Sequence, residues 1–238
     1  MPAASFLTRI LFLLALLTAA ARLAAGCGGD SSDSDDGGGA DQASSSETEG
    51  GGDSGDDEVA ARDGKYDEPP TLKLDPATKY VVEMKTNKGA FDIAVDPKAA
   101  PIAAANFVFL VKEGFYDGVP FHRVIKDFMV QGGDPSGTGL GGPGYELKDD
   151  PVKGAYSRGT VAMANAGPNT GGSQFFIVHG SNVSDTLPKD YIIFGKVDEA
   201  GMKVVDEIAG VEVEPNSSGE PSQPVDEVTI ESATLTES

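Results

Sequence analysis

FHRVIKDFMVQGGDP, residues 121–135, is the stretch that decides the fold, and ANAGPNTGGSQFFI follows at residues 164–177. Each stretch joins a short run of β-branched and aromatic residues, which favours a strand, to glycines that allow turns and close backbone approach. Together they place one arginine, Arg123, among apolar residues, amide side chains and glycines. That combination suits a pocket for a proline ring.

The segments before these stretches predict a hairpin and a helix. Lys79–Lys85 and Ala90–Val95 are β-prone runs, and the turn residues 86–89 separate them. A helix with Pro101 in its first turn should follow and end at Gly114. Its expected apolar stripe is Ile102, Ala105, Phe109 and Val111.

Short strands and one more helix are predicted for the rest of the chain. A helix at 200–209 carries Met202, Val205 and Ile208 at helical spacing. Strands are expected at 121–125, 128–131, 160–164, 174–179, 191–197 and 225–235. Many short strands with two helices favour a closed antiparallel barrel, although periodicity alone leaves a sandwich equally open.

The two quoted stretches resemble the signature blocks of the cyclophilin family of peptidyl-prolyl cis-trans isomerases, and the resemblance runs from about Tyr80 to about Leu235. It implies a mainly β domain over residues 71–238, built as a closed eight-stranded antiparallel barrel capped by two α-helices. It also implies an enzyme, a rotamase that accelerates rotation about X-Pro bonds, assists protein folding and needs no cofactor.

Arg123 is the predicted catalytic residue. An X-Pro bond rotates over a barrier of about 18–20 kcal/mol, because rotation destroys amide resonance. In the twisted state the prolyl nitrogen regains a lone pair, so a donor aimed at it binds the transition state selectively. A guanidinium stays charged and offers five N–H groups. The resemblance places the family's catalytic arginine at this position.

The predicted substrate site has an apolar part for the proline ring and a polar part for the peptide. Aromatic and thioether side chains suit the ring, whereas amide groups and free backbone suit peptide carbonyls and N–H groups. On strand alternation alone, the apolar members would be core residues. With the resemblance, the site consists of Phe128, Met129, Gln131, Ala164, Asn165, Ala166, Gln174, Phe176, Leu187 and Tyr191.

Two rim positions differ from animal cytosolic cyclophilins, which carry a tryptophan and a histidine there. Counting back from FGKV at 194–197, Thr186 and Tyr191 occupy these positions, and the chain has no tryptophan. We therefore expect weak cyclosporin binding but intact catalysis. His122 and His179 lie in no metal-ligand spacing and beside no nucleophile, so no metal site is expected.

The N-terminus predicts export. Arg9 precedes an apolar run, Ile10–Ala21, which is too short to span a bilayer and suits the core of a signal peptide. Residues 23–27 read LAAGC and resemble the lipobox of bacterial lipoproteins, where the thiol of Cys27 receives lipid. Cys27 is the only cysteine, so it forms no internal disulfide. We expect residues 1–27 to be a lipoprotein-type signal peptide.

Residues 28–70 predict a disordered acidic tether. They hold fourteen acidic residues against Arg62 and Lys65, with many glycines and serines and little apolar surface to offset ordering. The net charge of −20 disfavours nucleic acid as a partner. We expect a monomer that takes proline-containing polypeptides, held by lipid at the outer face of the cytoplasmic membrane, or secreted if Cys27 carries no lipid.

Two other functions fit the same residues. The groove could hold proline-containing segments of an envelope partner without catalysis, as a binding module anchored at the membrane. A purely structural envelope lipoprotein would make the match at the pocket positions a coincidence. An isomerase assay that compares the protein with Arg123→Ala separates these readings from the enzyme.

Overall fold

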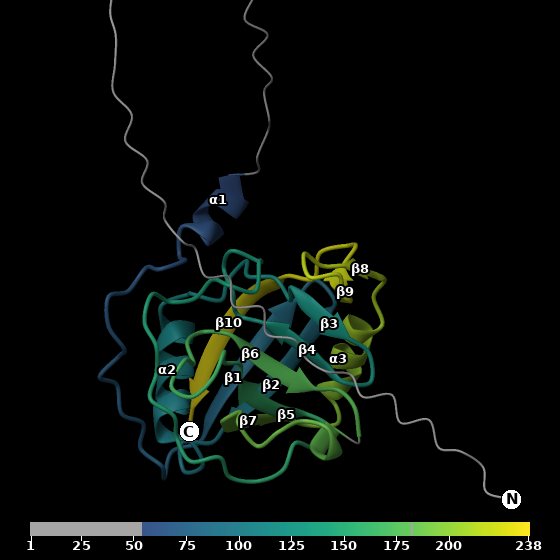
Figure 1. Cartoon of the computed structure of the whole chain (residues 1–238). Coiled ribbons are helices and arrows are strands. Elements are labelled where there is room, and N and C mark those ends of the chain that lie inside the picture. Colours follow the sequence, from purple (N-terminus) through teal and green to yellow (C-terminus); the bar gives the residue numbers. More distant parts are fainter. Residues whose placement is uncertain (1–53, 182) are drawn as a thin grey trace, which may run out of the picture. The chain divides into compact units, whose positions relative to one another are not determined.

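The structure is a computed structural model that describes residues 54–181 and 183–238. Eight strands form one antiparallel sheet in the order β10-β1-β2-β7-β5-β6-β4-β3, which curls around the core (Figure 1). The strands are β1 (Tyr80–Thr86), β2 (Gly89–Val95), β3 (Arg123–Ile125), β4 (Met129–Gly132), β5 (Thr160–Met163), β6 (Phe175–Val178), β7 (Ile193–Val197) and β10 (Ile230–Glu237). The expected mainly β, eight-stranded antiparallel architecture is confirmed.

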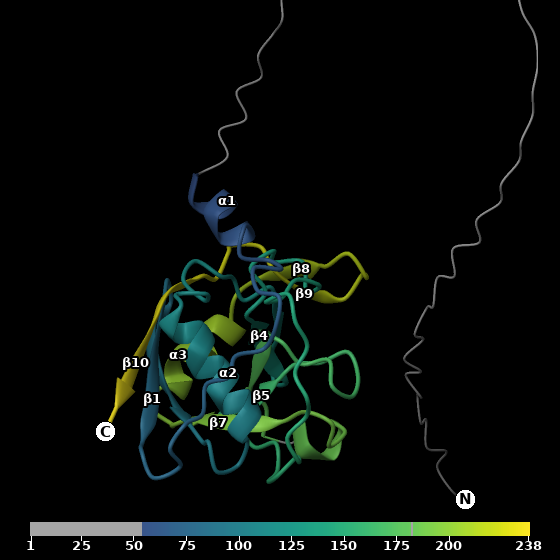
Figure 2. The same cartoon turned by 90° about the vertical axis from the view of Figure 1, so that its left-hand side faces the viewer.

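The two edges of this sheet, β10 and β3, meet through the segment that leads into β3. The N–H of Gly118 donates to the carbonyl of Ile230 at 2.6 Å, and the N–H of Phe121 donates to that of Val228 at 2.7 Å. The N–H of Ile230 donates in return to Val119 at 3.0 Å. Figure 2 shows β10 beside β1 at one edge of the sheet.

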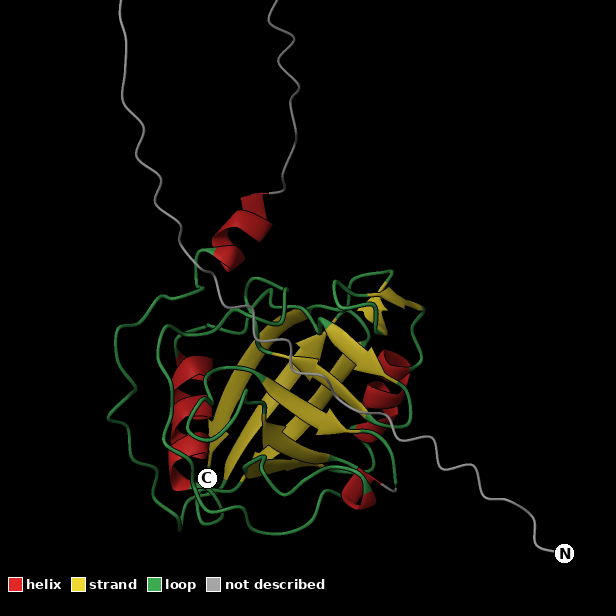
Figure 3. Cartoon of the chain, in the orientation of Figure 1, coloured by secondary structure: helices red, strands yellow, loops and turns green. Residues whose placement is uncertain are grey.

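Helices lie on both sides of the strands, as Figure 3 shows for α2 and α3. The helical elements are α1 (Ser54–Ala60), α2 (Pro101–Lys112), the 3-10 turn η1 (Val183–Asp185) and α3 (Met202–Ala209). A small hairpin, β8 (Val213–Pro215) with β9 (Pro221–Pro224), follows α3 and was not expected from the sequence. Among the described residues, no helix is long and apolar enough to span a bilayer.

Helix α2 forms where expected, but its buried face differs from the expected stripe. Its first turn is capped from outside the helix, because the side chain of Asp150 accepts from the N–H groups of Ile102 and Ala103, both at 2.9 Å. Ile102 is 40% exposed, so its place in the apolar stripe was wrong. Phe107 is fully buried instead, with its ring 4.9 Å from that of Phe194. The small residues of this helix allow burial on almost every side.

The described residues include part of the segment ahead of the expected domain boundary at residue 70. Residues 61–66, called the strap here, follow α1 and lie against the loop at 142–145. The N–H of Gly64 donates to Gly142 at 2.9 Å, and that of Tyr66 donates to Pro143 at 2.8 Å. Tyr66 also packs against aromatic rings of the domain: Phe109, Phe115 and Tyr145. This aromatic anchor holds the strap against the domain.

Several expectations fall on residues outside the described ranges. These are the signal peptide at 1–27, the lipid attachment at Cys27 and the tether from residue 28 to residue 53. They stay predictions from the sequence.

Candidate active site

The outer face of the neighbouring strands β4 and β6 carries the apolar part of the site. Along β6, Phe175 and Ile177 belong to the main core, whereas Phe176 and Val178 belong to a second cluster of buried residues. Alternate residues of a strand point to opposite faces of the sheet. Met129 on β4 joins the second cluster in the same way. These strands therefore have an apolar face on each side of the sheet.

The second cluster brings together every apolar side chain that the sequence predicts for the proline ring. Met129 and Phe176 are buried in it, and Phe128, Leu187 and Tyr191 are partly buried against it. The rings of Phe176 and Tyr191 lie 5.3 Å apart, edge to face. The result is an apolar surface outside the main core, of the chemistry that a pyrrolidine ring requires.

Tyr156 fixes the position of Tyr191. The hydroxyl of Tyr156 donates to the main-chain carbonyl of Tyr191 at 2.9 Å and accepts from its N–H at 3.0 Å. Burial raises the pKa of Tyr156, so this hydroxyl stays protonated and remains a donor at neutral pH. The loop that supplies Tyr191 is thereby held against the cluster.

Arg123 lies at the polar border of this cluster. It faces Gln131 across the β3–β4 ladder, and its Nη1 approaches the Oε1 of Gln131 at 3.4 Å and the Sδ of Met129 at 3.8 Å. Only 28% of its side chain is exposed. The cation thus lies beside the predicted proline pocket and is only partly exposed to solvent.

Glu220, which sequence reasoning missed, holds the other side of this guanidinium. Its two carboxylate oxygens accept from Nε at 2.6 Å and from Nη2 at 2.9 Å of Arg123. The hydrogen bond from Arg123 lowers the pKa of Glu220, so the carboxylate is charged at neutral pH. Asn216-Ser-Ser-Gly219 is a turn signal that could have revealed the hairpin, but not its partner.

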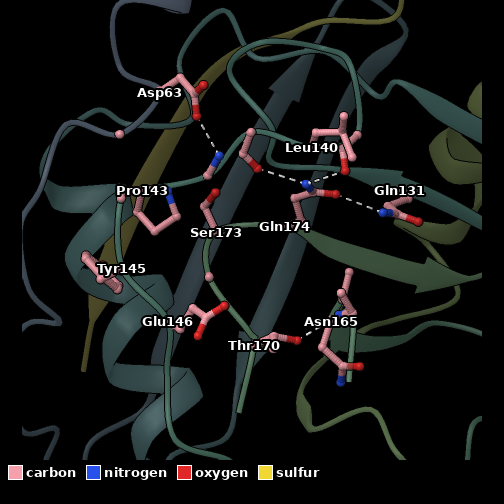
Figure 4. Close-up of a pocket in the computed structure, with 18 residues that line it drawn as sticks. Asp63, Gln131, Leu140, Pro143, Tyr145, Glu146, Asn165, Thr170, Ser173 and Gln174 are labelled. Atoms are coloured by element: carbon pink, nitrogen blue, oxygen red, sulfur yellow. Dashed lines mark hydrogen bonds between the residues drawn. The ribbon is translucent and has the colours of Figure 1, made fainter. Parts of the chain in front are cut away.

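The two predicted glutamines form a chain from Arg123 to the neighbouring loop. Gln131 donates from Nε2 to the Oε1 of Gln174 at 3.0 Å. Gln174 donates in turn to the carbonyls of Gly139 at 3.0 Å and Gly141 at 2.9 Å (Figure 4). Gln131, which faces Arg123, is therefore oriented by Gln174, and Gln174 is held in turn by the carbonyls of Gly139 and Gly141.

A cavity of about 640 Å³ adjoins these glutamines (Figure 4). Its lining includes five predicted substrate residues: Gln131, Ala164, Asn165, Ala166 and Gln174. Asp63 and Gly64 of the strap also line it, although the sequence assigned them to the tether. No hydrogen bond among the described residues uses the main-chain N–H or carbonyl of Asn165, so both can pair with a peptide.

The loop over this cavity is built around one buried carboxylate. Asp134 accepts from the N–H and hydroxyl of Ser136, both at 2.7 Å, and from the N–H groups of Gly139 at 2.6 Å and Gly141 at 3.1 Å. Burial raises the pKa of Asp134, but the hydrogen bonds from Ser136 and Gly141 outweigh it and leave the pKa below its ordinary value. The loop that receives Gln174 is fixed in this way.

The remaining candidate positions lie apart from the cavity of Figure 4. Thr186 is exposed and, with Phe128 and His179, lines a separate hollow. His179 pairs its Nε2 with Asp206 at 3.0 Å. The ring nitrogens of His122 are buried, with no hydrogen-bond partner in the described chain. No group of three or more potential metal ligands occurs within 54–181 and 183–238.

Comparison with known proteins identifies the family. Residues 81–235 match the family model described as cyclophilin type peptidyl-prolyl cis-trans isomerase/CLD. Peptidyl-prolyl cis-trans isomerase B of Streptomyces anulatus is 41% identical over 179 residues, which cover 67% of this chain and 98% of that protein. A peptidyl-prolyl cis-trans isomerase of Helicobacter pylori is 46% identical over 151 residues, covering 57% and 90%.

A solved structure and a longer relative agree with this. The crystal structure of a Cryptosporidium parvum cyclophilin type peptidyl-prolyl cis-trans isomerase with the dipeptide Ala-Pro matches with a TM-score of 0.59 and 34% identity, covering 66% of this chain and 98% of that one. A Streptococcus pyogenes protein, named as both phosphatase and peptidyl-prolyl cis-trans isomerase, is 40% identical over 192 residues, but the match spans only 40% of it.

The chain therefore belongs to the cyclophilin family. It is a cyclophilin-type peptidyl-prolyl cis-trans isomerase. The strap lies ahead of the matched residues 81–235, so the family match does not describe this wall of the cavity.

Proposed function

We propose that this isomerase acts on X-Pro bonds of exported proteins at the outer face of the cytoplasmic membrane, where lipid on Cys27 anchors it. The support is in the sequence: the apolar leader, LAAGC at 23–27 and the acidic segment that follows. Each buried methylene of an acyl chain contributes about 0.8 kcal/mol, so two or three chains suffice without a spanning helix. Repulsion between the acidic side chains of this segment would extend the tether and lift the domain away from an anionic membrane.

In the proposed mechanism, the cluster of Met129 and Phe176 binds the proline ring and the backbone of Asn165 holds the peptide on one side of the rotating bond. The observation that carries the proposal is the guanidinium of Arg123 at the border of that cluster. The N–H groups of Arg123 that Glu220 does not hold donate to the prolyl nitrogen only once rotation has localised the lone pair. The interaction therefore lowers the barrier without strengthening ground-state binding.

A protease-coupled assay on a peptide of the type succinyl-Ala-Ala-Pro-Phe tests turnover. An isomerase at a concentration far below that of the peptide abolishes the slow phase that comes from the cis isomer, whereas a binding module slows or preserves it. A slow phase that persists at this low protein concentration would favour the non-catalytic module. The Arg123→Ala variant is the control for a contaminating isomerase.

Mass spectrometry of the mature N-terminus tests the anchor. We expect cleavage before Cys27 and the added mass of a diacylglycerol on its thiol, and release of the protein into the medium when Cys27 is changed to Ser. An unmodified Cys27, or cleavage elsewhere, would remove the anchored form and leave a secreted isomerase.

Cyclosporin binding tests the rim. Thr186 stands where animal cytosolic cyclophilins carry the indole that supports this ligand, and a threonine offers far less apolar surface. We expect calorimetry to show an affinity much weaker than nanomolar, and Thr186→Trp to strengthen it. Nanomolar affinity of the unaltered protein would contradict this expectation.

A further inference from the structure

The catalytic guanidinium of the proposed mechanism is held along one edge by Glu220. The carboxylate accepts a hydrogen bond from the Nε–H at 2.6 Å and another from one N–H of Nη2 at 2.9 Å. Three of the five N–H groups of Arg123 stay free of this pair. Nη1 faces the Oε1 of Gln131 and the Sδ of Met129, which belong to the substrate site. The carboxylate thus turns the free end of the guanidinium towards the pocket.

The hairpin of β8 and β9 is folded so as to present this carboxylate. The side-chain Oδ1 of Asn216 accepts from the N–H groups of Ser218 and Glu220, both at 3.0 Å. The N–H of Asn216 donates to the carbonyl of Glu220 at 2.8 Å, and Gly219 supplies the positive φ of +84° that the turn needs. The Nδ2 of Asn216 donates to the hydroxyl of the buried Ser222 at 3.1 Å. Glu220 therefore sits on a rigid turn.

The position of Arg123 explains why such a partner is needed. Strand β3 is an edge of the sheet and pairs only with β4. Strand β9 packs against β3 without joining the ladder. A long arginine side chain on an edge strand has many rotamers, and fixing it beforehand removes that entropy cost from the transition state. An ion pair that is about one third exposed contributes little to stability by itself.

We propose that Glu220 is a positioning residue for isomerisation, which holds the guanidinium of Arg123 so that its free N–H groups meet the prolyl nitrogen of the twisted bond. This inference rests on the proposed role of Arg123. In this role Glu220 acts through Arg123 alone. Its loss should therefore lower kcat while KM stays nearly constant.

Glu220→Gln is the decisive variant, because it keeps the size of the side chain and replaces one of two acceptors by an NH2 group that repels the guanidinium. A misplacement of about 1 Å can cost up to about a hundredfold in rate, and we expect kcat/KM of the full chain to fall about tenfold. Glu220→Asp should recover part of this loss. Glu214→Gln, an exposed residue on the same hairpin, is the matched control and should change nothing.

Two further readouts separate positioning from a structural role. The Nε–H resonance of Arg123 in a proton–nitrogen NMR spectrum should shift and exchange faster with water in Glu220→Gln, while the urea midpoint stays that of the unaltered chain. In a double-mutant cycle, Glu220→Gln should have no further effect once Arg123 is Ala, because the two residues act as one unit.

The outcomes are distinct. Unchanged kcat/KM in Glu220→Gln, with Arg123→Ala strongly impaired, would overturn the positioning role and leave the proposed function intact. A rise in kcat/KM would also overturn it, and would show that the carboxylate competes with substrate for the guanidinium. Full activity of Arg123→Ala would remove the proposed mechanism and this inference together.

Discussion

Arg123 owes its place to the register of two short strands. Arg123 faces Gln131, and Val124, the next residue, is buried in the main core. Because side chains alternate along a strand, a slip of one residue would turn the guanidinium into the core and Val124 out to the site. The apolar run around Arg123 fixes this register, since only one alternation buries the valine.

His122, the neighbour of Arg123, should make stability depend on pH. Burial lowers the pKa of His122 below 6.5, Asp134 opposes this shift and Arg123 adds to it. A group whose pKa is lowered by folding stabilises the fold above its unfolded pKa, and that stability is lost as the pH falls through the folded value. We expect the free energy of unfolding to fall as the pH drops below about 6.5.

His122→Gln should remove this slope. The carboxylates of Glu220 and Asp134 have pKa values lowered from 4.5 and 3.8, so their contributions are lost only at more acidic pH. Urea unfolding at about pH 7.5 and about pH 5 isolates the histidine. An equal slope in both proteins would mean that His122 is not the titrating group.

The pocket residues could be predicted from sequence because their chemistry is local. Gln131 and Phe176 stand in runs that also specify strands, so a motif that places the strands places the side chains. Glu220 and Asp63 could not be found this way. Each meets the site through a loop contact, 97 residues from Arg123 in one case and 79 from Gly142 in the other. No spacing pattern in the sequence predicts a contact between residues so far apart in the chain.

The strands of the site were predicted as elements, but their two-faced burial was not. All four residues of β5 and of β6 are buried, because the main core covers one face and the second cluster covers the other. A continuous apolar run of this kind does not say which residues face inward. For α2, the same ambiguity led to the wrong assignment of Ile102.

The loop that bears Tyr191 should depend on one hydroxyl. Tyr156→Phe leaves the N–H and the carbonyl of Tyr191 without their partner, which should cost about 1–3 kcal/mol of stability. It should also raise KM for proline peptides, because Tyr191 loses its fixed position. Urea unfolding and steady-state kinetics measure the two effects.

Tyr80→Phe is the matched control for this variant. Tyr80 lies on β1, outside the site. Its hydroxyl accepts a hydrogen bond from the N–H of Asp75 at 3.0 Å. Loss of this hydroxyl should lower stability without changing KM. An equal rise of KM in both variants would show that the effect of Tyr156 is a general one.

At the scale of the whole molecule, residues outside the family match at 81–235 also pack on the domain. The strap adds a wall to the cavity and an aromatic anchor to the core. Tyr66→Ala should lower the free energy of unfolding by roughly 2 kcal/mol, because a large, partly buried ring is lost. Chemical denaturation of the full chain measures this.

Tyr66→Phe separates packing from polarity. The hydroxyl of Tyr66 is buried and has no hydrogen-bond partner among residues 54–181 and 183–238. Removing it should leave stability unchanged or raise it slightly, since a buried polar group without a partner is costly. Equal losses in Tyr66→Phe and Tyr66→Ala would contradict packing as the source of the anchor.

The most direct test of the whole account is kcat/KM of Arg123→Ala, measured with its affinity for a proline peptide. Removal of a donor that acts only on the transition state should lower kcat/KM by about 10² to 10³, as for other preorganised donors. The affinity for the ground-state peptide should change only a few-fold. A variant that isomerises as fast as the unaltered protein, or that loses rate only in proportion to lost binding, would contradict the account.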